Sequence, residues 1–144
     1  MDYKLEHFPL QLEIRIDLSE LDLFGHVNNV MYMKYLQASR VNYWEKSGVN
    51  TLFRESGVGP ALASTSCQFR KPLCYPGNIR IGARIEFVKN SSFGVHHHIY
   101  NSDGDLCAIG NDVIVLFDYS RNEKFLLTPE MIGRMEEIEG RKLR

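Results

Sequence analysis

The chain has 144 residues and a mass of 16.6 kDa, with 44% hydrophobic and 24% charged residues, which fits one globular domain over residues 1–144 and excludes disordered, collagen-like and coiled-coil classes. Seventeen Lys and Arg against eighteen Asp and Glu leave a net charge of -1, so no overall positive field exists to hold nucleic acid or an anionic membrane. No apolar run approaches the roughly 18 residues of a membrane span, and the N-terminus lacks a secretory signal, so we expect a cytoplasmic protein.

The first part of the chain predicts one strand followed by a long helix. Apolar and polar residues alternate from Leu10 to Leu18, which is the period of a half-buried strand. The loop from Ser19 to Asn29 ends in Asn28 and Asn29, whose side chains suit a helix cap. A helix then runs from about Val30 to Lys46. Its apolar residues cover most of its circumference, so we expect it to be largely buried.

The remaining chain predicts four strands and a short helix. The strand-like runs are Ala61–Phe69, Ile79–Phe87, Phe93–Asn101 and Leu106–Phe117. The last two indicate a hairpin joined by a two-residue turn at Asp103-Gly104. Thr128-Pro129-Glu130 has the cap, first-turn Pro and early acid of a helix start, which predicts a short C-terminal helix packed on an edge.

The order of these elements indicates the fold class. One strand, a long helix, four strands and a short helix do not give the βαβα alternation of a parallel sheet. A largely antiparallel, five-stranded sheet wrapped around the one apolar helix satisfies the order. We therefore predict an α+β fold.

The loop before the long helix has the highest density of polar side chains that could take part in chemistry. Asp22, His26, Asn28 and Asn29 lie within a few residues of the helix start. A helix N-terminus offers unpaired N–H groups that stabilise a carbonyl oxygen gaining negative charge, and Asp22 is placed to activate water or to attack directly. The alternative is structural: the two Asn residues only cap the helix, and Asp22 is a solvated loop acid.

These residues carry a resemblance to a known family. Asp22-Leu-Phe-Gly25-His26-Val27-Asn28-Asn29-x-x-Tyr32, followed by Arg40, resembles the signature of hotdog-fold thioesterases of the 4-hydroxybenzoyl-CoA thioesterase family. Several downstream motifs stand in that family's order: Phe69-Arg70-Lys71-Pro72, Tyr75-Pro76-Gly77-Asn78, Ser91-Ser92, Asp103-Gly104 and Ala108-x-Gly110. Plant-type acyl-carrier-protein thioesterases have a similar stretch, so the motif does not fix the carrier.

The resemblance implies a hotdog fold and a reaction. The expected reaction is hydrolysis of an acyl-CoA thioester to a carboxylic acid and CoA, with no cofactor besides the CoA of the substrate. The resemblance implies that Asp22 acts as general base or nucleophile and that backbone N–H groups near Asn29 and Val30 polarise the carbonyl. It also implies homodimers joined edge to edge, often paired into homotetramers. An acyl-carrier-protein thioesterase and a non-catalytic acyl-thioester binding domain remain alternatives.

Individual residues receive expected roles on this basis. We assign Asp22, His26 and Asn29 to catalysis, and Gly25, Val30, Tyr32, Arg70 and Lys71 to substrate binding. The basic residues Arg70, Lys71 and Lys89 are candidates for the phosphates of CoA. For His26 three roles stay open: it hydrogen-bonds the substrate, it orients Asp22, or it packs to hold the loop. Asn29 is expected to cap the helix with its side chain, and Arg40 to satisfy carbonyls or an acid near the subunit interface. Gln37 stands where relatives often carry an acid, which leaves Asp22 as the expected catalytic acid.

A metal site is not expected. His96 and His98 point to one face of a strand, but no third ligand has a recognisable spacing, so we expect His96, His97 and His98 to be solvent or interface residues. The three cysteines, Cys67, Cys74 and Cys107, are too few and too widely spaced for a disulfide framework, and we expect reduced thiols.

Overall fold

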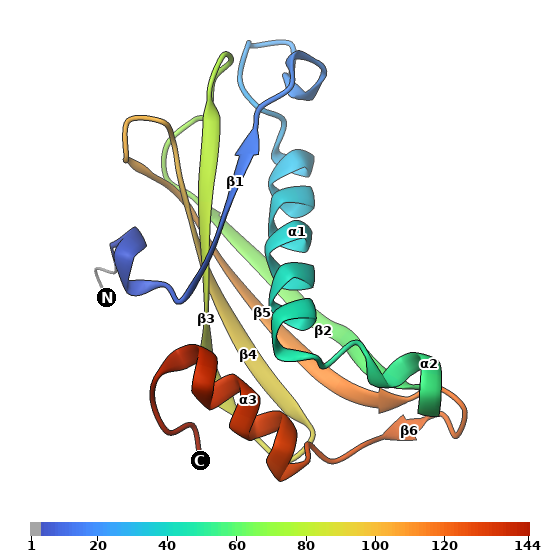
Figure 1. The fold of residues 1–144 in the computed structure, drawn as a ribbon. Coiled ribbons are helices and arrows are strands. Elements are labelled where there is room, and N and C mark those ends of the chain that lie inside the picture. The colour runs from blue at the N-terminus through green and yellow to red at the C-terminus, as the bar shows by residue number, and fades with distance from the viewer. Residues whose placement is uncertain (1–3) are drawn as a thin grey trace.

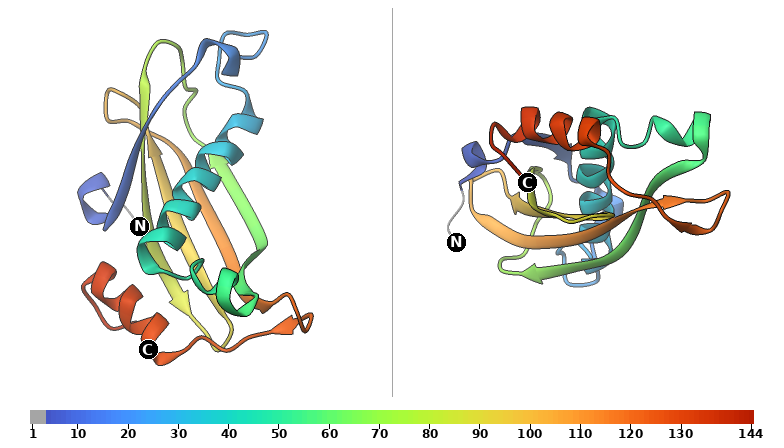
Figure 2. Two further views of the ribbon diagram at one scale, coloured as in Figure 1. Left: turned by 45° about the vertical axis from the view of Figure 1, so that its right-hand side comes forward. Right: turned by 90° about the horizontal axis from the view of Figure 1, so that it is seen from below.

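The computed structural model describes residues 4–144, which fold around one antiparallel sheet (Figure 1). Five strands lie side by side in the order β1 (Leu10–Arg15), β3 (Asn78–Val88), β4 (Ser92–Tyr100), β5 (Leu106–Asp118) and β2 (Val58–Phe69), and the short β6 (Glu123–Lys124) pairs with β5. The helices are η1 (Leu5–His7), η2 (Leu18–Glu20), α1 (Asn29–Ser47), α2 (Leu52–Ser56) and α3 (Pro129–Glu139). The sheet curls around α1 (Figure 2), which confirms the predicted α+β hotdog architecture.

The expected elements form, and the differences are local. The first strand ends at Arg15 rather than Leu18, because Asp17 caps the 3-10 helix η2 by accepting a hydrogen bond from the Ser19 N–H at 3.0 Å. The turn between β4 and β5 is longer than the predicted Asp103-Gly104 pair and spans residues 101–105. Two elements, α2 and β6, were not predicted, because they are too short to show a period.

Helix α1 is capped at both ends and buries one face. The Asn28 side chain accepts a hydrogen bond from the Val30 N–H at 3.1 Å, and Gly48 ends the helix at a φ of +77°, which glycine adopts without strain. The buried positions are Tyr32, Tyr35, Leu36, Ser39, Arg40, Tyr43 and Ser47. The expectation of a largely buried helix is wrong for the opposite face, where Val30 is 59% exposed.

The C-terminal helix packs where the expectation placed it, on an edge. β1 pairs with β3 only as far as Ala83, so the following part of β3 has no strand on that side. α3 lies there and buries Met131, Ile132 and Met135 in the core, and Arg141 donates a hydrogen bond to the Ile85 carbonyl. This helix therefore closes the end of the core that lies far from the start of α1 (Figure 1).

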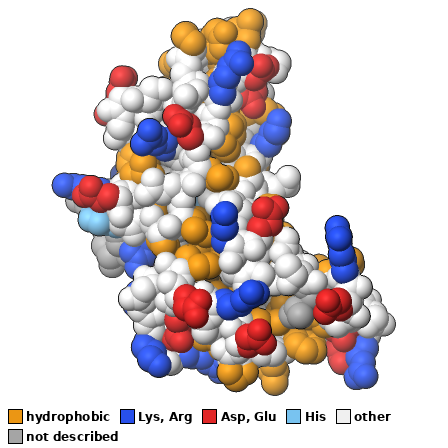
Figure 3. Space-filling model, in the orientation of Figure 1, with side chains coloured by type: hydrophobic (Ala, Val, Ile, Leu, Met, Phe, Trp, Pro, Cys, Tyr) orange, Lys and Arg blue, Asp and Glu red, His pale blue; other side chains and the backbone are white. Residues whose placement is uncertain are grey.

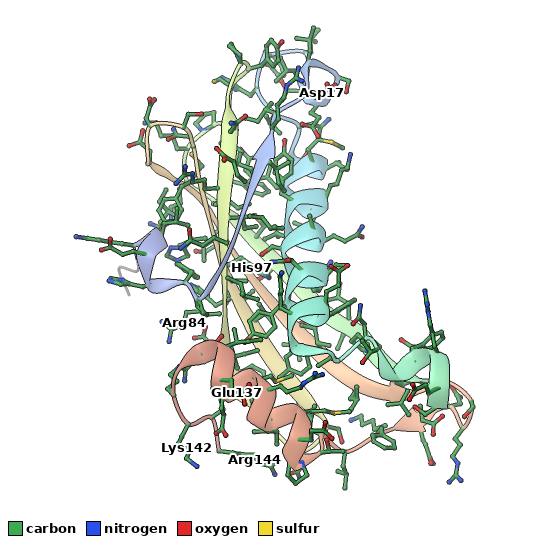
Figure 4. All side chains as sticks on the ribbon, in the orientation of Figure 1. Asp17, Arg84, His97, Glu137, Lys142 and Arg144 are labelled. Carbon is green, nitrogen blue, oxygen red and sulfur yellow. The ribbon has the colours of Figure 1, made fainter. Side chains whose placement is uncertain are left out.

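The core consists of two apolar clusters separated by a polar layer. One cluster includes Leu36 and Ile99, and the other includes Tyr43 and Val95. Between these positions lie the buried polar residues Ser39, Arg40, His97 and Asp112. Figure 4 shows His97 between the sheet and α1.

The surface mixes charges. Figure 3 shows Lys and Arg interspersed with Asp and Glu on one face of the molecule. Within residues 4–144, no helix has the length and apolar character needed to cross a membrane. Strand β2 forms one edge of the sheet, and most of its side chains are exposed.

Candidate active site

The loop that carries Asp22 is closed by its own hydrogen bonds. The Asp22 N–H donates to the His26 carbonyl at 2.7 Å, and Gly25 makes the turn possible with a φ of +82°. Oδ1 of Asp22 accepts hydrogen bonds from the N–H groups of Phe24 at 2.8 Å and His26 at 3.2 Å. Oδ2 of the same carboxylate has no hydrogen-bond partner among residues 4–144. One oxygen therefore holds the loop, while the other is available for chemistry.

Glu20 fastens this loop to the rest of the fold. Its backbone carbonyl accepts the Asn28 N–H at 2.8 Å, which ties the two ends of the loop together. Its side-chain Oε1 accepts hydrogen bonds from the Tyr35 hydroxyl at 2.9 Å and from the Asp17 N–H at 2.8 Å. Glu20 and Tyr35 were not predicted as site residues, because only the packing of α1 brings them together.

The start of α1 leaves one donor open. The Val30 N–H is occupied by the Asn28 side chain, so the expected role of Val30 as a carbonyl-polarising donor is wrong. The expectation that the Asn29 side chain caps the helix is also wrong, because Asn28 is the cap. The Asn29 N–H has no partner within the described chain and stands at the positive end of the helix dipole. It is the donor that can stabilise an oxyanion at this end of the helix.

One pocket gathers most of the predicted site residues. It has a volume of about 320 Å³ and is lined by Asp22, His26, Val27, Asn29, Tyr32, Phe69, Arg70, Lys71 and Pro72. Six residues named from the sequence thus meet in one place. Gly25 and Val30 do not line the pocket, and Gly25 acts on the loop conformation instead. The His26 side chain is exposed and lines the pocket, so it does not pack to hold the loop.

Tyr32 and Phe69 form the aromatic wall of this pocket. Their ring centroids lie 4.9 Å apart in an edge-to-face arrangement, which joins α1 to the end of β2. Burial raises the pKa of Tyr32 to about 12. Tyr32 is therefore a wall and not a proton donor at neutral pH. Sequence analysis did not name Phe69 as a site residue, although it stands beside Arg70.

The two basic residues of the pocket differ. The Lys71 ammonium lies 2.5 Å from the Asp105 carboxylate, and this contact raises the pKa of Lys71 and lowers the pKa of Asp105. Lys71 is thus already paired with an anion from the loop between β4 and β5. Arg70 is exposed at the mouth of the pocket, with its backbone N–H bound to the Cys107 carbonyl.

The polar layer beneath α1 forms a second, separate network. Arg40 lies 3.1 Å from Asp112, His97 Nε2 lies 2.7 Å from Asp112, and the Thr65 hydroxyl donates to the same carboxylate at 2.7 Å. A carboxylate only accepts, so His97 carries its proton on Nε2, and Nδ1 accepts from the Ser39 hydroxyl at 2.9 Å. Arg40 therefore satisfies an acid, as expected.

Burial governs the charges in this network. Burial lowers the pKa of His97, and the hydrogen bond to Asp112 opposes this only in part. Burial also acts to raise the pKa of Asp112, but hydrogen bonds from His97 and Thr65 and the charge of Arg40 outweigh it, so the pKa lies below its ordinary value. The expectation that His97 and His98 are solvent or interface residues is wrong, because both are buried within the chain.

The structure describes no metal-binding cluster. Among residues 4–144, no group of three or more His, Cys, Asp or Glu side chains has the geometry to hold a metal ion. Cys67, Cys74 and Cys107 are free thiols, and burial raises the pKa of Cys67 and Cys107.

Comparisons with known proteins agree with this architecture. The sequence model of the Thioesterase-like superfamily matches residues 16–135. An uncharacterized Bacillus subtilis protein, YsmA, is 28% identical over 103 residues, which cover 72% of this chain and 69% of that protein. The chloroplastic acyl-acyl carrier protein thioesterase ATL3 of Arabidopsis thaliana is 30% identical over 91 residues, 62% of this chain and 48% of that enzyme. The crystal structure of a Thermus thermophilus thioesterase complexed with coenzyme A and Zn has a TM-score of 0.83 at 24% identity, covering 96% of this chain and 99% of that one.

Proposed function

Because the chain belongs to the thioesterase-like superfamily, we propose that it hydrolyses the thioester bond of an acyl-CoA, with Asp22 as the catalytic carboxylate. The observation that carries the proposal is the state of the Asp22 carboxylate, which lines the pocket. Its Oδ1 is held by two backbone N–H groups, while Oδ2 has no partner in the described chain. A carboxylate held in this way needs no rearrangement before it acts.

The reaction follows from the groups around the pocket. The thioester carbonyl oxygen accepts a hydrogen bond from the Asn29 N–H at the start of α1, where the helix dipole favours the developing negative charge. Asp22 takes a proton from water as the water oxygen bonds to the carbonyl carbon. The carbon–sulfur bond then breaks, and the departing thiolate takes up a proton. In the nucleophilic variant, Asp22 itself bonds to the carbonyl carbon, and the carbon–sulfur bond breaks to release the thiolate. Water then cleaves the resulting anhydride to the carboxylic acid and free Asp22.

His26 and Tyr32 have supporting roles in this proposal. The His26 ring lies exposed at the pocket, where it hydrogen-bonds the substrate. Tyr32 and Phe69 form an apolar wall against which the acyl group lies. Arg70 contributes a positive charge at the pocket mouth.

The test uses two substitutions at Asp22 that separate catalysis from loop structure. Asn at this position keeps an oxygen for the N–H groups of Phe24 and His26 but cannot act as a base, whereas Ala removes both functions. We expect Asp22→Asn to lower kcat by about 10²–10⁴-fold in a free-thiol assay with short, long and aromatic acyl-CoAs, while the melting temperature stays at the wild-type value. An Asp22→Asn enzyme with wild-type kcat contradicts the proposal.

A second candidate carrier is the acyl carrier protein, and the similarity to the plant acyl-acyl carrier protein thioesterase favours including it. The chain spans about half the length of that enzyme, with 48% covered. The same acyl group presented on CoA and on acyl carrier protein distinguishes the two carriers by their kcat/KM values. Tight binding of either thioester without thiol release identifies instead a non-catalytic binding domain.

A further inference from the structure

Three adjoining cavities lead from the candidate pocket over the end of the sheet. The pocket at Asp22 shares Lys71 and Pro72 with a middle cavity of about 240 Å³. The middle cavity shares Asn78, Asn101 and Ser102 with an outer cavity of about 740 Å³. The shared lining residues make these cavities neighbours in a row from the start of α1 to the loop between β4 and β5, and we call this row the groove.

The walls of the groove are held by hydrogen bonds between distant segments. The Ser102 hydroxyl accepts from the Asn78 N–H at 2.9 Å and donates to the Asn78 carbonyl at 3.1 Å. The Asn101 side-chain oxygen accepts from the N–H groups of Asp103 at 3.0 Å and Asp105 at 2.9 Å. These contacts join the start of β3 to the loop after β4, so the middle of the groove has a defined shape.

The two ends and the middle of the groove differ in chemistry. The middle cavity combines apolar residues with polar and charged ones, and its lining includes Ile16, Leu73, Pro76, Lys71, Asn78, Ser102 and Asp103. The outer cavity carries the cations Lys4 and Arg80 and the anion Glu13. Arg80 Nε lies 3.9 Å from Glu13 Oε1, which is longer than a hydrogen bond, and the Arg80 side chain is 58% exposed.

We propose that this groove binds the CoA carrier, with the pantetheine arm in the middle cavity and the phosphate-bearing nucleotide in the outer cavity against Arg80 and Lys4. The inference rests on the proposed function, because a thioester held at Asp22 must send its carrier arm along an open path. An extended amide chain suits a cavity that offers both apolar and polar walls, and phosphates suit the cationic end.

This placement revises the expected phosphate ligands. Lys71 stands at the junction of the first two cavities and is already paired with Asp105, so it forms part of the wall. Lys89, a further basic residue near the sheet, follows the opposite end of β3 and lies over the Phe87 ring. Arg80 instead lies within the groove, two residues from Asn78 on the same strand.

The experiment compares two thioesters of one acyl group: acyl-CoA and the truncated acyl-N-acetylcysteamine, which has no phosphate. We expect Arg80→Gln to raise KM for acyl-CoA roughly two- to fivefold, the effect of losing one exposed charge pair, without changing kcat. The truncated thioester should show the same KM with both enzymes. Arg54→Gln on α2, the same charge change outside the groove, should alter neither substrate.

A substitution of opposite sign strengthens the test. Glu13→Gln removes the anion of the outer cavity but keeps an acceptor for the Asn78 side chain, which donates to Glu13 at 3.2 Å. We expect this variant to lower KM for acyl-CoA and to leave the truncated thioester unchanged. An Arg80→Gln enzyme with unchanged KM for acyl-CoA, or with an equal change for both thioesters, overturns the proposal.

Direct binding separates this proposal from the proposed reaction. Calorimetry of free CoA should give a dissociation constant roughly two- to fivefold higher for Arg80→Gln than for the wild type, whether or not the thioester is hydrolysed. If no thiol is released but the dissociation constants for CoA differ in this way, the proposed hydrolysis is wrong and the assignment of the groove to CoA is supported. If CoA binds wild type and Arg80→Gln equally, or does not bind, the groove assignment is wrong.

Discussion

Asp112 offers a sharp test of the polar layer under α1. Its side chain is fully buried, and its carboxylate is contacted by His97 and Thr65 at 2.7 Å each and by Arg40 at 3.1 Å. Asp112→Ala removes the anion from all of these partners at once. The Arg40 side chain, which is 7% exposed, then holds a buried positive charge without its partner.

The magnitude follows from this loss. Breaking a buried ion pair by removing one partner costs about 3–5 kcal/mol of unfolding free energy. At about 2.1 cal/mol/K of unfolding entropy per residue, a chain of 144 residues has an unfolding entropy of about 0.3 kcal/mol/K. The melting temperature of Asp112→Ala should therefore fall by roughly 10–17 °C.

The assay is urea denaturation together with thermal melting, and a double variant provides its control. Arg40→Met with Asp112→Leu removes both charges, so no unpaired ion remains, and the pair should lose less stability than Asp112→Ala alone. A double variant that loses as much stability as Asp112→Ala, or more, contradicts the coupling between Arg40 and Asp112. A loss below about 1 kcal/mol in Asp112→Ala refutes the reasoning altogether, because that is the cost of an exposed pair.

Two further predictions concern Glu20 and His97. Glu20→Ala should lower kcat by up to about 100-fold with little change in KM, because the loop of Asp22 loses its hydrogen bond to Tyr35. Glu20→Gln keeps an acceptor for the Tyr35 hydroxyl and should retain activity. Equal kcat in both variants refutes the positioning role of Glu20. The folded-state pKa of His97 lies below its unfolded value, so its contribution to stability is complete above about pH 6.5 and falls by up to about 1.4 kcal/mol per pH unit as the pH drops. Urea midpoints measured at pH 7.5, 6.5 and 5.5 should therefore change less with pH in His97→Gln than in the wild type. An equal change with pH in both proteins contradicts this role of His97.

The fold was predictable because its strands have periodic patterns of apolar residues and its long helix has clear start and stop signals. β5 alternates buried and partly exposed positions along nearly its whole length, and α1 is flanked by a capping Asn28 and a terminating Gly48. The predicted bounds are wrong where one side chain stabilises a structure that differs from the one the hydrophobic pattern or turn motif predicts. Asp17 starts η2 where alternation continues, and Asn101 organises a longer loop where Asp103-Gly104 favours a tight turn.

In the candidate site, contacts between residues close in the sequence were predictable, and contacts between separate elements were not. Asp22, His26 and Asn29 are neighbours in the sequence, so their motif predicts their meeting in one pocket. The link from Glu20 to Tyr35 and the link from Arg40 to Asp112 join separate elements, which no local pattern reveals. These contacts required the fold.

His97 is a separate case, because the signal was present in the sequence. Phe93, Val95 and Ile99 are the apolar residues of the inward face of β4, and His97 has the same parity. Strand periodicity therefore predicts a buried His97. The expectation of solvent exposure was wrong because it treated His96, His97 and His98 as one polar group. A buried His beneath a helix then implies polar partners, which Ser39 and Asp112 provide.

The two oxygens of Asp22 unite the structural and functional interpretations of the loop. The structural interpretation is correct for Oδ1, because this atom holds the N–H groups of Phe24 and His26. The proposed reaction needs only Oδ2, which has no hydrogen-bond partner in the described chain. Loss of activity in Asp22→Ala alone does not distinguish the two, since that change also releases the loop. The Asp22→Asn variant keeps the loop and removes the base, so its activity decides whether the loop is merely a capped turn or a catalytic one.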